Sequence, residues 1–179
     1  EPQANAMYAQ VDAMNFENVT SHWGLGEPSF SSGAAWGDLD GDGDLDIVIN
    51  DVNGPAKIYR NNSLHGEGDA KESNHWVSVS LHSNGQNTHA VGARIDLWAG
   101  EQMMRRDNIP QRGFQSSVEP GVWFGLGDHA SIDSLRVTWP DGVIHHIRET
   151  SVLPINQRIE LHREELDRTK AHELPLGYD

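Results

Sequence analysis

The stretch Asp38-Leu39-Asp40-Gly41-Asp42-Gly43-Asp44-Leu45-Asp46 carries a carboxylate at every second position over nine residues. Ca²⁺ binds six to eight oxygen ligands in a flexible shell, so a loop that offers an oxygen at each of these positions can surround the ion. Gly41 and Gly43 can adopt the positive φ angles that such a tight loop requires. The predicted metal ligands are the side chains of Asp38, Asp40, Asp42 and Asp46 and the backbone carbonyl of Asp44.

The loop differs from an EF-hand in its second half. An EF-hand has a bidentate Glu at its twelfth position, where this chain has Ile49, and is flanked by helices. Here the β-branched run Ile47-Val48-Ile49 follows Asp46 at once and predicts a strand. A solvated acidic turn is the alternative, but five neighbouring carboxylates without a counter-ion would repel one another. The sequence therefore predicts a calcium loop between two strands.

The charge of the chain is negative and unevenly distributed. The net charge is −14 over 179 residues, and ten acidic residues precede Lys57, the first base. This charge argues against nucleic acid or an anionic membrane as a partner. The absence of cysteine excludes disulfides and thiolate chemistry, and no apolar run is long enough to predict membrane insertion.

The calcium loop and the first residue both indicate where the protein is located relative to the cell. Weak calcium sites are filled outside cells, where the ion is millimolar. The sequence starts at Glu1 rather than Met, as if a signal peptide or an upstream segment had been removed. We therefore expect a secreted protein that is extracellular or located at the cell surface.

The remaining sequence predicts an all-β fold. Apolar residues alternate with polar ones in Trp76–Leu81 and Ala93–Trp98, and further short strands follow at spacings of about ten residues. This pattern favours an antiparallel β-sandwich or barrel, with a hairpin whose two-residue turn is Asp141-Gly142. The predicted organisation is an N-terminal arm (1–15), a β-loop-β unit held together by calcium (16–73), a β domain (74–161) and a C-terminal tail with a short helix (162–179).

The N-terminal arm has apolar residues at helical spacing. Met7, Tyr8, Val11 and Met14 predict a short amphipathic helix or a packing arm, and a terminus without fixed structure is the alternative.

Two segments resemble known families. Residues 33–47, Gly-Ala-Ala-Trp-Gly-Asp-Leu-Asp-Gly-Asp-Gly-Asp-Leu-Asp-Ile, resemble one FG-GAP/VCBS-type calcium repeat of the integrin-like propellers. Residues 75–161 resemble the ASPIC/UnbV domain, which follows such repeats in cartilage acidic protein and in bacterial exoproteins. The matching pieces are Asn74-His75-Trp76-Val77, Val91-Gly92-Ala93-Arg94, Phe124-Gly125-Leu126-Gly127 and Val137-Thr138-Trp139-Pro140-Asp141-Gly142. The resemblance implies an extracellular, calcium-binding protein without catalytic activity.

The sequence gives weaker signals for a second metal site, a sugar-binding site or a catalytic site. His145 and His146 would point to opposite faces of a strand, and the other eight of the ten histidines are scattered, so we expect surface histidines rather than a second metal site. Trp76, Trp98, Trp123 and Trp139 fall in strand patterns and predict core or sheet-face residues, with a sugar-binding platform as the alternative. No nucleophile elbow, phosphate-binding loop or triad is recognisable, so we expect no enzyme.

Relatives carry several FG-GAP-type repeats, and this chain has one. A single repeat cannot bury its own apolar face, so either the β domain of its own chain or another subunit must cover it. We expect a structural or cell-adhesion protein that self-assembles as a homo-oligomer, for which an open-ended filament is one form. The contacts would be made by edge strands and by the terminal arms (3–15 and 174–178). The alternative is an extracellular module that binds a glycan or a cell-surface protein.

Overall fold

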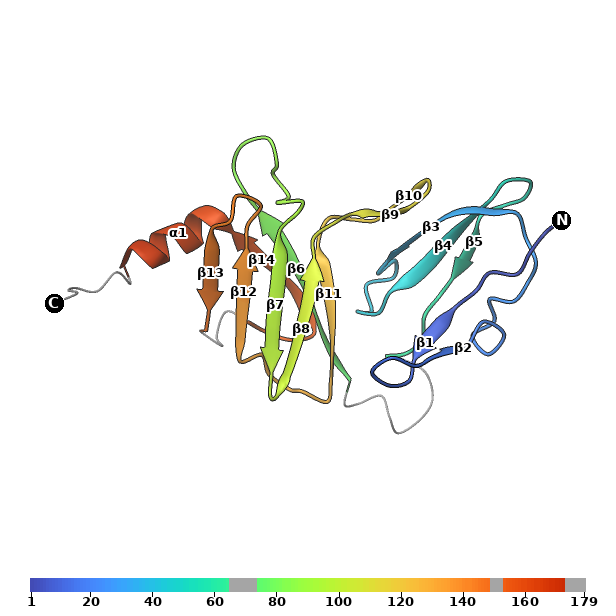
Figure 1. Ribbon diagram of the computed structural model, residues 1–179, viewed down its shortest axis with the longest axis horizontal. Coiled ribbons are helices and arrows are strands. Elements are labelled where there is room, and N and C mark those ends of the chain that lie inside the picture. The colour runs from blue at the N-terminus through green and yellow to red at the C-terminus, as the bar shows by residue number, and fades with distance from the viewer. Residues whose placement is uncertain (65–73, 149–152, 173–179) are drawn as a thin grey trace.

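The computed structural model describes residues 1–64, 74–148 and 153–172, and these form an all-β protein with one helix (Figure 1). The strands before residue 65 are β1 (Tyr8–Gln10), β2 (Phe16–Asn18), β3 (Ser31–Gly37), β4 (Asp46–Asp51) and β5 (Lys57–Tyr59). Those after residue 73 are β6 (His75–His82), β7 (Arg94–Ala99), β8 (Gln102–Asp107), β9 (Gln111–Gly113), β10 (Ser116–Ser117), β11 (Val122–Gly127), β12 (Ser134–Thr138), β13 (Ile144–Ile147) and β14 (Gln157–His162). Helix α1 spans Arg163–His172.

The main core lies between two sheets of the C-terminal part. One sheet has the order β11-β6-β14, and the other has the order β13-β12-β7-β8. Their facing positions are the alternate apolar residues of each strand, such as Val77 and Val79 of β6 and Ile95 and Leu97 of β7, and all four are fully buried. The predicted period-two strands therefore form a sandwich, with Trp139 and Phe124 among its largest buried side chains.

One pairing in the sandwich differs from the antiparallel prediction. β14 pairs with β6 in parallel, in the register Ile159↔Val79 and His162↔His82. The alternation of each strand predicts which side chains face the core, but it does not determine the direction in which two distant strands run. The parallel arrangement is possible because the whole segment between β6 and β14 acts as the connection.

The strands before residue 65 form two small sheets. β3, β4 and β5 form an antiparallel meander, in which Gly37↔Asp46 closes the pairing of β3 with β4. The N-terminal helix prediction is wrong, because Tyr8–Gln10 is a strand that pairs with Phe16–Asn18. Gln3 also bridges to Ser29, so the arm folds back on its own chain. The four apolar residues at helical spacing did not produce a helix, because the main chain of this segment pairs with the strand Phe16–Asn18 instead.

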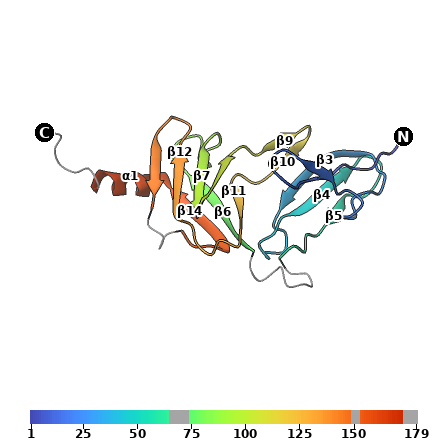
Figure 2. The ribbon, with the colours of Figure 1, turned by 60° about the horizontal axis from the view of Figure 1, so that its bottom comes forward.

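A hairpin of β9 and β10 extends from the sandwich to the N-terminal unit, as Figures 1 and 2 both show. The Ala34 N–H donates to Ser116 Oγ at 3.0 Å, which joins β3 to the hairpin. A β-carbon on Gly33 would lie 2.8 Å from the carbonyl oxygen of Gln115, so the two backbones approach closely. Phe114 lies at the turn of this hairpin, between β9 and β10.

The turn between β12 and β13 is one residue longer than predicted. The Gly142 N–H donates to the Trp139 carbonyl and the Trp139 N–H donates to the Val143 carbonyl, so Pro140, Asp141 and Gly142 form a three-residue loop. Only Gly142 has a positive φ, 86°. This is the common arrangement of a turn followed by a left-handed residue, and Pro140 suits its first turn position.

Helix α1 confirms the predicted short C-terminal helix. Arg163 pairs with Asp141 at 2.7 Å and lies over the Trp139 ring, and Asp167 lies 3.0 Å from Nε2 of the buried His145. These contacts attach the helix to the β12–β13 hairpin. Among the described residues, no helix has both the length and the apolar character needed to cross a membrane. The predicted terminal arm 174–178 lies outside the described residues.

Candidate calcium site

The acidic loop is the connection of the β3–β4 hairpin, because β3 ends at Gly37 and β4 begins at Asp46. Asp38 organises the first half of the loop. One of its carboxylate oxygens accepts hydrogen bonds from the N–H groups of Gly41 and Asp42, at 2.8 and 3.1 Å, and the other accepts from Gly43 at 3.1 Å. Gly41 and Gly43 have φ angles of 77° and 96°, as predicted from their place in the loop.

Three of the predicted ligands come together. Asp38, Asp40 and Asp42 each offer a carboxylate oxygen, and these oxygens lie within 4.8 Å of one another. A cluster of carboxylate oxygens at this spacing suits a hard divalent cation such as Ca²⁺. The structure therefore brings the first half of the predicted ligand set to one point.

Asp44 and Asp46 are not in this three-carboxylate group, and both accept hydrogen bonds from residues 61–64. Asp46 accepts from Leu39 N–H at 3.0 Å and from Asn61 N–H at 2.8 Å. Asp44 Oδ2 accepts from the Ser63 hydroxyl and from Leu64 N–H at 3.3 and 3.2 Å. Asp44 is 6% exposed, and its Oδ1 is buried without a hydrogen-bond partner among the described residues.

An unpartnered carboxylate oxygen in a buried position is costly, and a bound cation would satisfy it. Burial raises the pKa of the Asp44 carboxyl, and the charges of Asp42 and Asp46 act in the same direction, against hydrogen bonds from Leu64 and Ser63. Both the three-carboxylate cluster and this orphan oxygen fit a calcium loop. If an ion binds here, Asp38, Asp40 and Asp42 would hold it, and its charge would offset the mutual repulsion of the loop.

Arg60 is a member of this site that sequence reasoning missed. Its Nε lies 2.7 Å from Asp40 and its Nη2 lies 3.2 Å from Asp42. The hydrogen bond to Asp42, and then the charge of Asp40, raise the pKa of the Arg60 guanidinium. The β4–β5 register pairs Ile47 with Tyr59 and thereby places Arg60 beside the loop. A hairpin between the strand at Ile47-Val48-Ile49 and the segment that follows it would have been the signal for this proximity.

The loop also contacts the sandwich. A β-carbon on Gly43 would lie 2.2 Å from Nε1 of Trp76, so only glycine fits there. Trp76 in turn stacks on Trp123, with ring centroids 4.9 Å apart. Val77 and Val122 face the core, so their neighbours Trp76 and Trp123 lie on the outer face of the three-stranded sheet, where Trp76 contacts the loop and Trp123 stacks on Trp76.

A cavity of about 340 Å³ lies beside this contact, between β3 and the sandwich. Trp36 and Trp123 line it together with Arg112, Asp107 and Glu119. The Arg112 guanidinium lies 5.1 Å from the centre of the Trp36 ring, and its Nε is buried without a hydrogen-bond partner among the described residues. The cavity thus combines aromatic surfaces with charged groups, and the sequence had indicated none of this grouping.

Residues 83–168 match the family model described as ASPIC and UnbV, so the chain contains an ASPIC/UnbV domain. The matched residues include most of the sandwich, from the residue after β6 through β14 and into α1. This agrees with the resemblance found in the sequence of the β domain. This match begins at residue 83 and therefore does not test the FG-GAP/VCBS resemblance of residues 33–47.

The chain is also similar to curated proteins named cartilage acidic protein 1. The protein of Xenopus tropicalis is 30% identical over 149 residues, which are 80% of this chain and 22% of that protein. The Mus musculus and Homo sapiens proteins are 33% and 32% identical over 110 residues, which are 59% of this chain and 16% and 15% of theirs. The chain thus spans about a fifth or less of the length of these relatives.

Proposed function

We propose that this chain is a secreted, calcium-binding structural or adhesive protein without catalytic activity that self-assembles through edge strands and its terminal arms. The observation that carries the proposal is a set of exposed apolar side chains on the β1–β2 hairpin and its turn. Its four members are Tyr8, Val11, Met14 and Phe16, and each is more than half exposed. We refer to these four residues as the hairpin patch.

The N-terminal unit buries little of its apolar surface. The main core cluster contains residues 77–161 only, whereas Leu25 and Ile49 are the buried large apolar residues of the part before residue 65. Ile58 on β5 is 68% exposed, and in the described part of the chain β5 pairs with β4 alone. Exposed apolar surface and an uncovered strand edge both favour contact with another chain.

The shape of the molecule supports a head-to-tail contact. The N-terminal unit and α1 lie at opposite ends of the long axis (Figure 1). A contact between unlike ends of two copies closes into a ring or continues as a filament, depending on the rotation at each step. The N-terminal arm folds back on its own chain, so its side chains rather than its main chain would make this contact.

The calcium part of the proposal rests on the three carboxylates of the loop and on the unpartnered oxygen of Asp44. The extracellular part is supported by the ASPIC/UnbV domain and by relatives named for cartilage, a tissue rich in extracellular matrix. The match to the Xenopus protein covers 80% of the chain and therefore extends before residue 74, into the unit that carries the loop.

Self-assembly predicts that the full chain in Ca²⁺ forms species larger than a monomer, measured by light scattering after size-exclusion chromatography and by negative-stain microscopy. The double substitution Val11→Glu and Met14→Glu is expected to shift the population to monomer, because it places charges on the hairpin patch. Ile109→Glu is the matched control, since Ile109 is also exposed but lies outside the patch and outside any strand. A parent chain that remains monomeric at high concentration with Ca²⁺ would contradict the proposal.

The cavity supports a second candidate function, a module that binds a glycan. Aromatic rings together with charged hydrogen-bonding groups are the usual lining of a site for a polar ligand with apolar faces. If the cavity binds sugars, Trp36→Ala should reduce binding by roughly tenfold on a glycan array or by calorimetry, because the variant removes one of the two aromatic rings that line the cavity and stacking of a nucleic-acid base on one such ring is worth about 1–3 kcal/mol. Trp23→Ala is the control, since Trp23 is exposed but does not line the cavity. Equal glycan binding by both variants would exclude the cavity as the site.

A further inference from the structure

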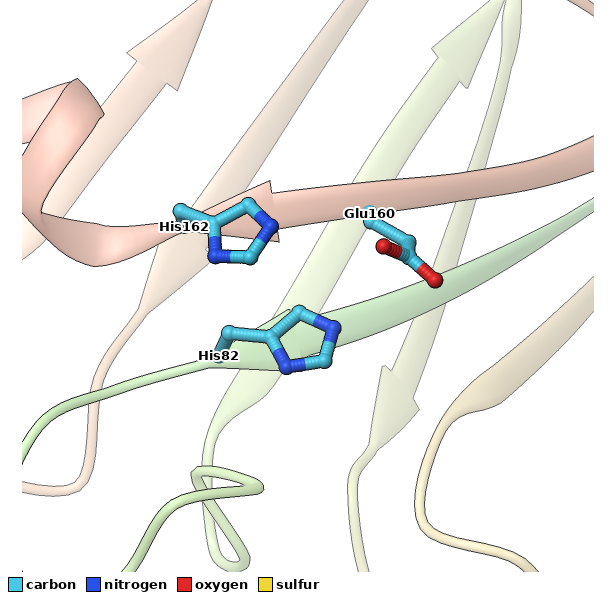
Figure 3. A group of neighbouring side chains, drawn as sticks. All are labelled: His82, Glu160 and His162. Atoms are coloured by element: carbon cyan, nitrogen blue, oxygen red, sulfur yellow. The ribbon is translucent and has the colours of Figure 1, made fainter.

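Three side chains with metal-binding atoms meet on the outer face of the sheet β11-β6-β14. Glu160 and His162 are two residues apart on β14, so they project from the same face. The parallel register pairs His162 with His82, the last residue of β6. Leu81 and Leu161 face the core, which places His82, Glu160 and His162 on the opposite, solvent side (Figure 3).

The geometry of this cluster is compact. One ligand atom from each of the three residues lies within 4.8 Å of the others. The rings of His82 and His162 stack with centroids 4.5 Å apart and planes inclined by 15°. Nε2 of His82 is buried and has no hydrogen-bond partner in the described part of the chain. A buried ring nitrogen without a partner requires an explanation, and a metal provides one once a side-chain rotation directs the in-plane lone pairs of the two stacked rings to the same ion.

We propose that His82, Glu160 and His162 form a second metal site, selective for Zn²⁺ and related transition metals rather than Ca²⁺. Imidazole nitrogens suit zinc, cobalt, nickel and copper, whereas calcium takes oxygen ligands. Two histidines and one glutamate are a known zinc ligand set that leaves a fourth position for water. His89 supplies a third imidazole nearby, with its ring centroid 6.4 Å from that of His82.

The proposed zinc site is separate from the acidic loop. Trp76 covers Gly43 of the loop near the start of β6, and His82 lies six residues further along the same strand. At about 3.3 Å per residue this separation is roughly 20 Å. The two sites also differ in ligand chemistry, so calcium can fill one while zinc fills the other.

A metal here would connect the two strands of the parallel pair. Its ligands come from β6 and from β14, whose last residue is followed directly by α1. Binding to the folded arrangement alone stabilises it, because strands that are apart in the unfolded chain cannot share the ion. Zinc is therefore expected to raise the melting temperature of the sandwich without any change in the calcium loop.

The test uses the full chain without a histidine tag and with Ca²⁺ in excess, so that the acidic loop is occupied. Titration with Co²⁺ is expected to give visible absorption bands of a low-coordination site at one metal per chain, and Zn²⁺ is expected to remove them. His162→Asn and Glu160→Gln are each expected to weaken Zn²⁺ binding more than about tenfold, since even loss of an outer-shell partner costs about that much. Both positions are exposed, so the fold should survive.

His146→Asn is the matched control, because His146 is an exposed histidine on β13 and lies outside the cluster. It should bind Co²⁺ and Zn²⁺ like the parent, and zinc should raise its melting temperature equally. The proposal is overturned if the parent shows no Co²⁺ bands at tens of micromolar metal, or if His162→Asn and Glu160→Gln bind zinc as tightly as His146→Asn. Because calcium is held constant, either result leaves the proposed calcium function unaffected.

Discussion

Removal of Ca²⁺ by an excess of chelator is expected to lower the melting temperature of the chain by about 5–10 °C. A ligand at a hundred times its dissociation constant stabilises the folded state by about 2.7 kcal/mol. For a chain of this length, each kcal/mol corresponds to about 2–4 °C. The physical reason is that Asp38, Asp40 and Asp42 hold their oxygens within 4.8 Å of one another, so their charges repel without a cation.

Single substitutions test how much one loop carboxylate contributes to the calcium-dependent shift in melting temperature. Asp40→Asn should remove part of the calcium-dependent shift, because one carboxylate of the cluster is lost. Asp128→Asn is the control, since Asp128 is exposed and distant from the loop in sequence, and it should keep the full shift. A melting curve of the parent that is unchanged by chelator would contradict the coupling between calcium and folding.

Arg60 is expected to affect both the stability of the calcium-free loop and its affinity for calcium. Its guanidinium already lies against Asp40 and Asp42, so it lowers the repulsion of the loop without calcium and opposes the entry of a second cation. Arg60→Gln is therefore expected to lower the melting temperature in chelator and to tighten calcium binding in a calorimetric titration. Weaker calcium binding by this variant would show that Arg60 supports the site rather than competes with the ion.

Asp96→Ala is expected to destabilise the sandwich by about 3 kcal/mol, measured as the free energy of unfolding in urea. Asp96 lies on β7, is 1% exposed, and is directly opposite Arg105 on β8 and Arg136 on β12. Arg105 Nε donates to its Oδ1 at 2.5 Å and Arg136 Nε donates to its Oδ2 at 2.9 Å. Removing one member of a buried ion pair costs about 3–5 kcal/mol, and the partial exposure of both arginines favours the lower end.

The matched control is Asp107→Ala. Asp107 pairs with Arg94 at 2.9 Å, but both side chains are nearly half exposed. An exposed ion pair contributes about 0–1 kcal/mol, so this variant should unfold almost like the parent. Equal losses in the two variants would mean that the burial of Asp96 does not determine the effect.

The pH dependence follows from the same contacts. Burial of Asp96 acts to raise its pKa, but the hydrogen bonds from Arg105 and Arg136 outweigh burial, and the pKa of the carboxyl is lowered. A carboxyl with a lowered pKa in the folded state stabilises the fold above its unfolded pKa, about 3.9, and loses that contribution as the pH falls through the folded pKa. Stability measured below about pH 4 should therefore decline less steeply in Asp96→Asn than in the parent.

Much of the local structure could be predicted from the sequence. The β-branched run Ile47-Val48-Ile49 favours a strand, the alternation in 76–81 and 93–98 also reports which face of the strand is apolar, and β4, β6 and β7 form at these places. The acidic loop was predictable for the same reason, because its carboxylates and glycines lie within nine consecutive residues. The N-terminal helix was wrong because four apolar residues at helical spacing also fit a hairpin, and Tyr8–Gln10 pairs with Phe16–Asn18.

The sequence by itself determined the all-β class, the acidic loop at Asp38–Asp46 between two strands and the core-facing residues of the sandwich, because each depends on neighbours a few positions apart. The tertiary structure alone decided the parallel pairing of β14 with β6, the position of Arg60 beside the loop and the cavity between Trp36 and Trp123. It also brought His82 to Glu160 and His162, about eighty residues further along the chain. Such groupings depend on the register between strands that are distant in sequence, and no local pattern of side chains specifies which strands become neighbours.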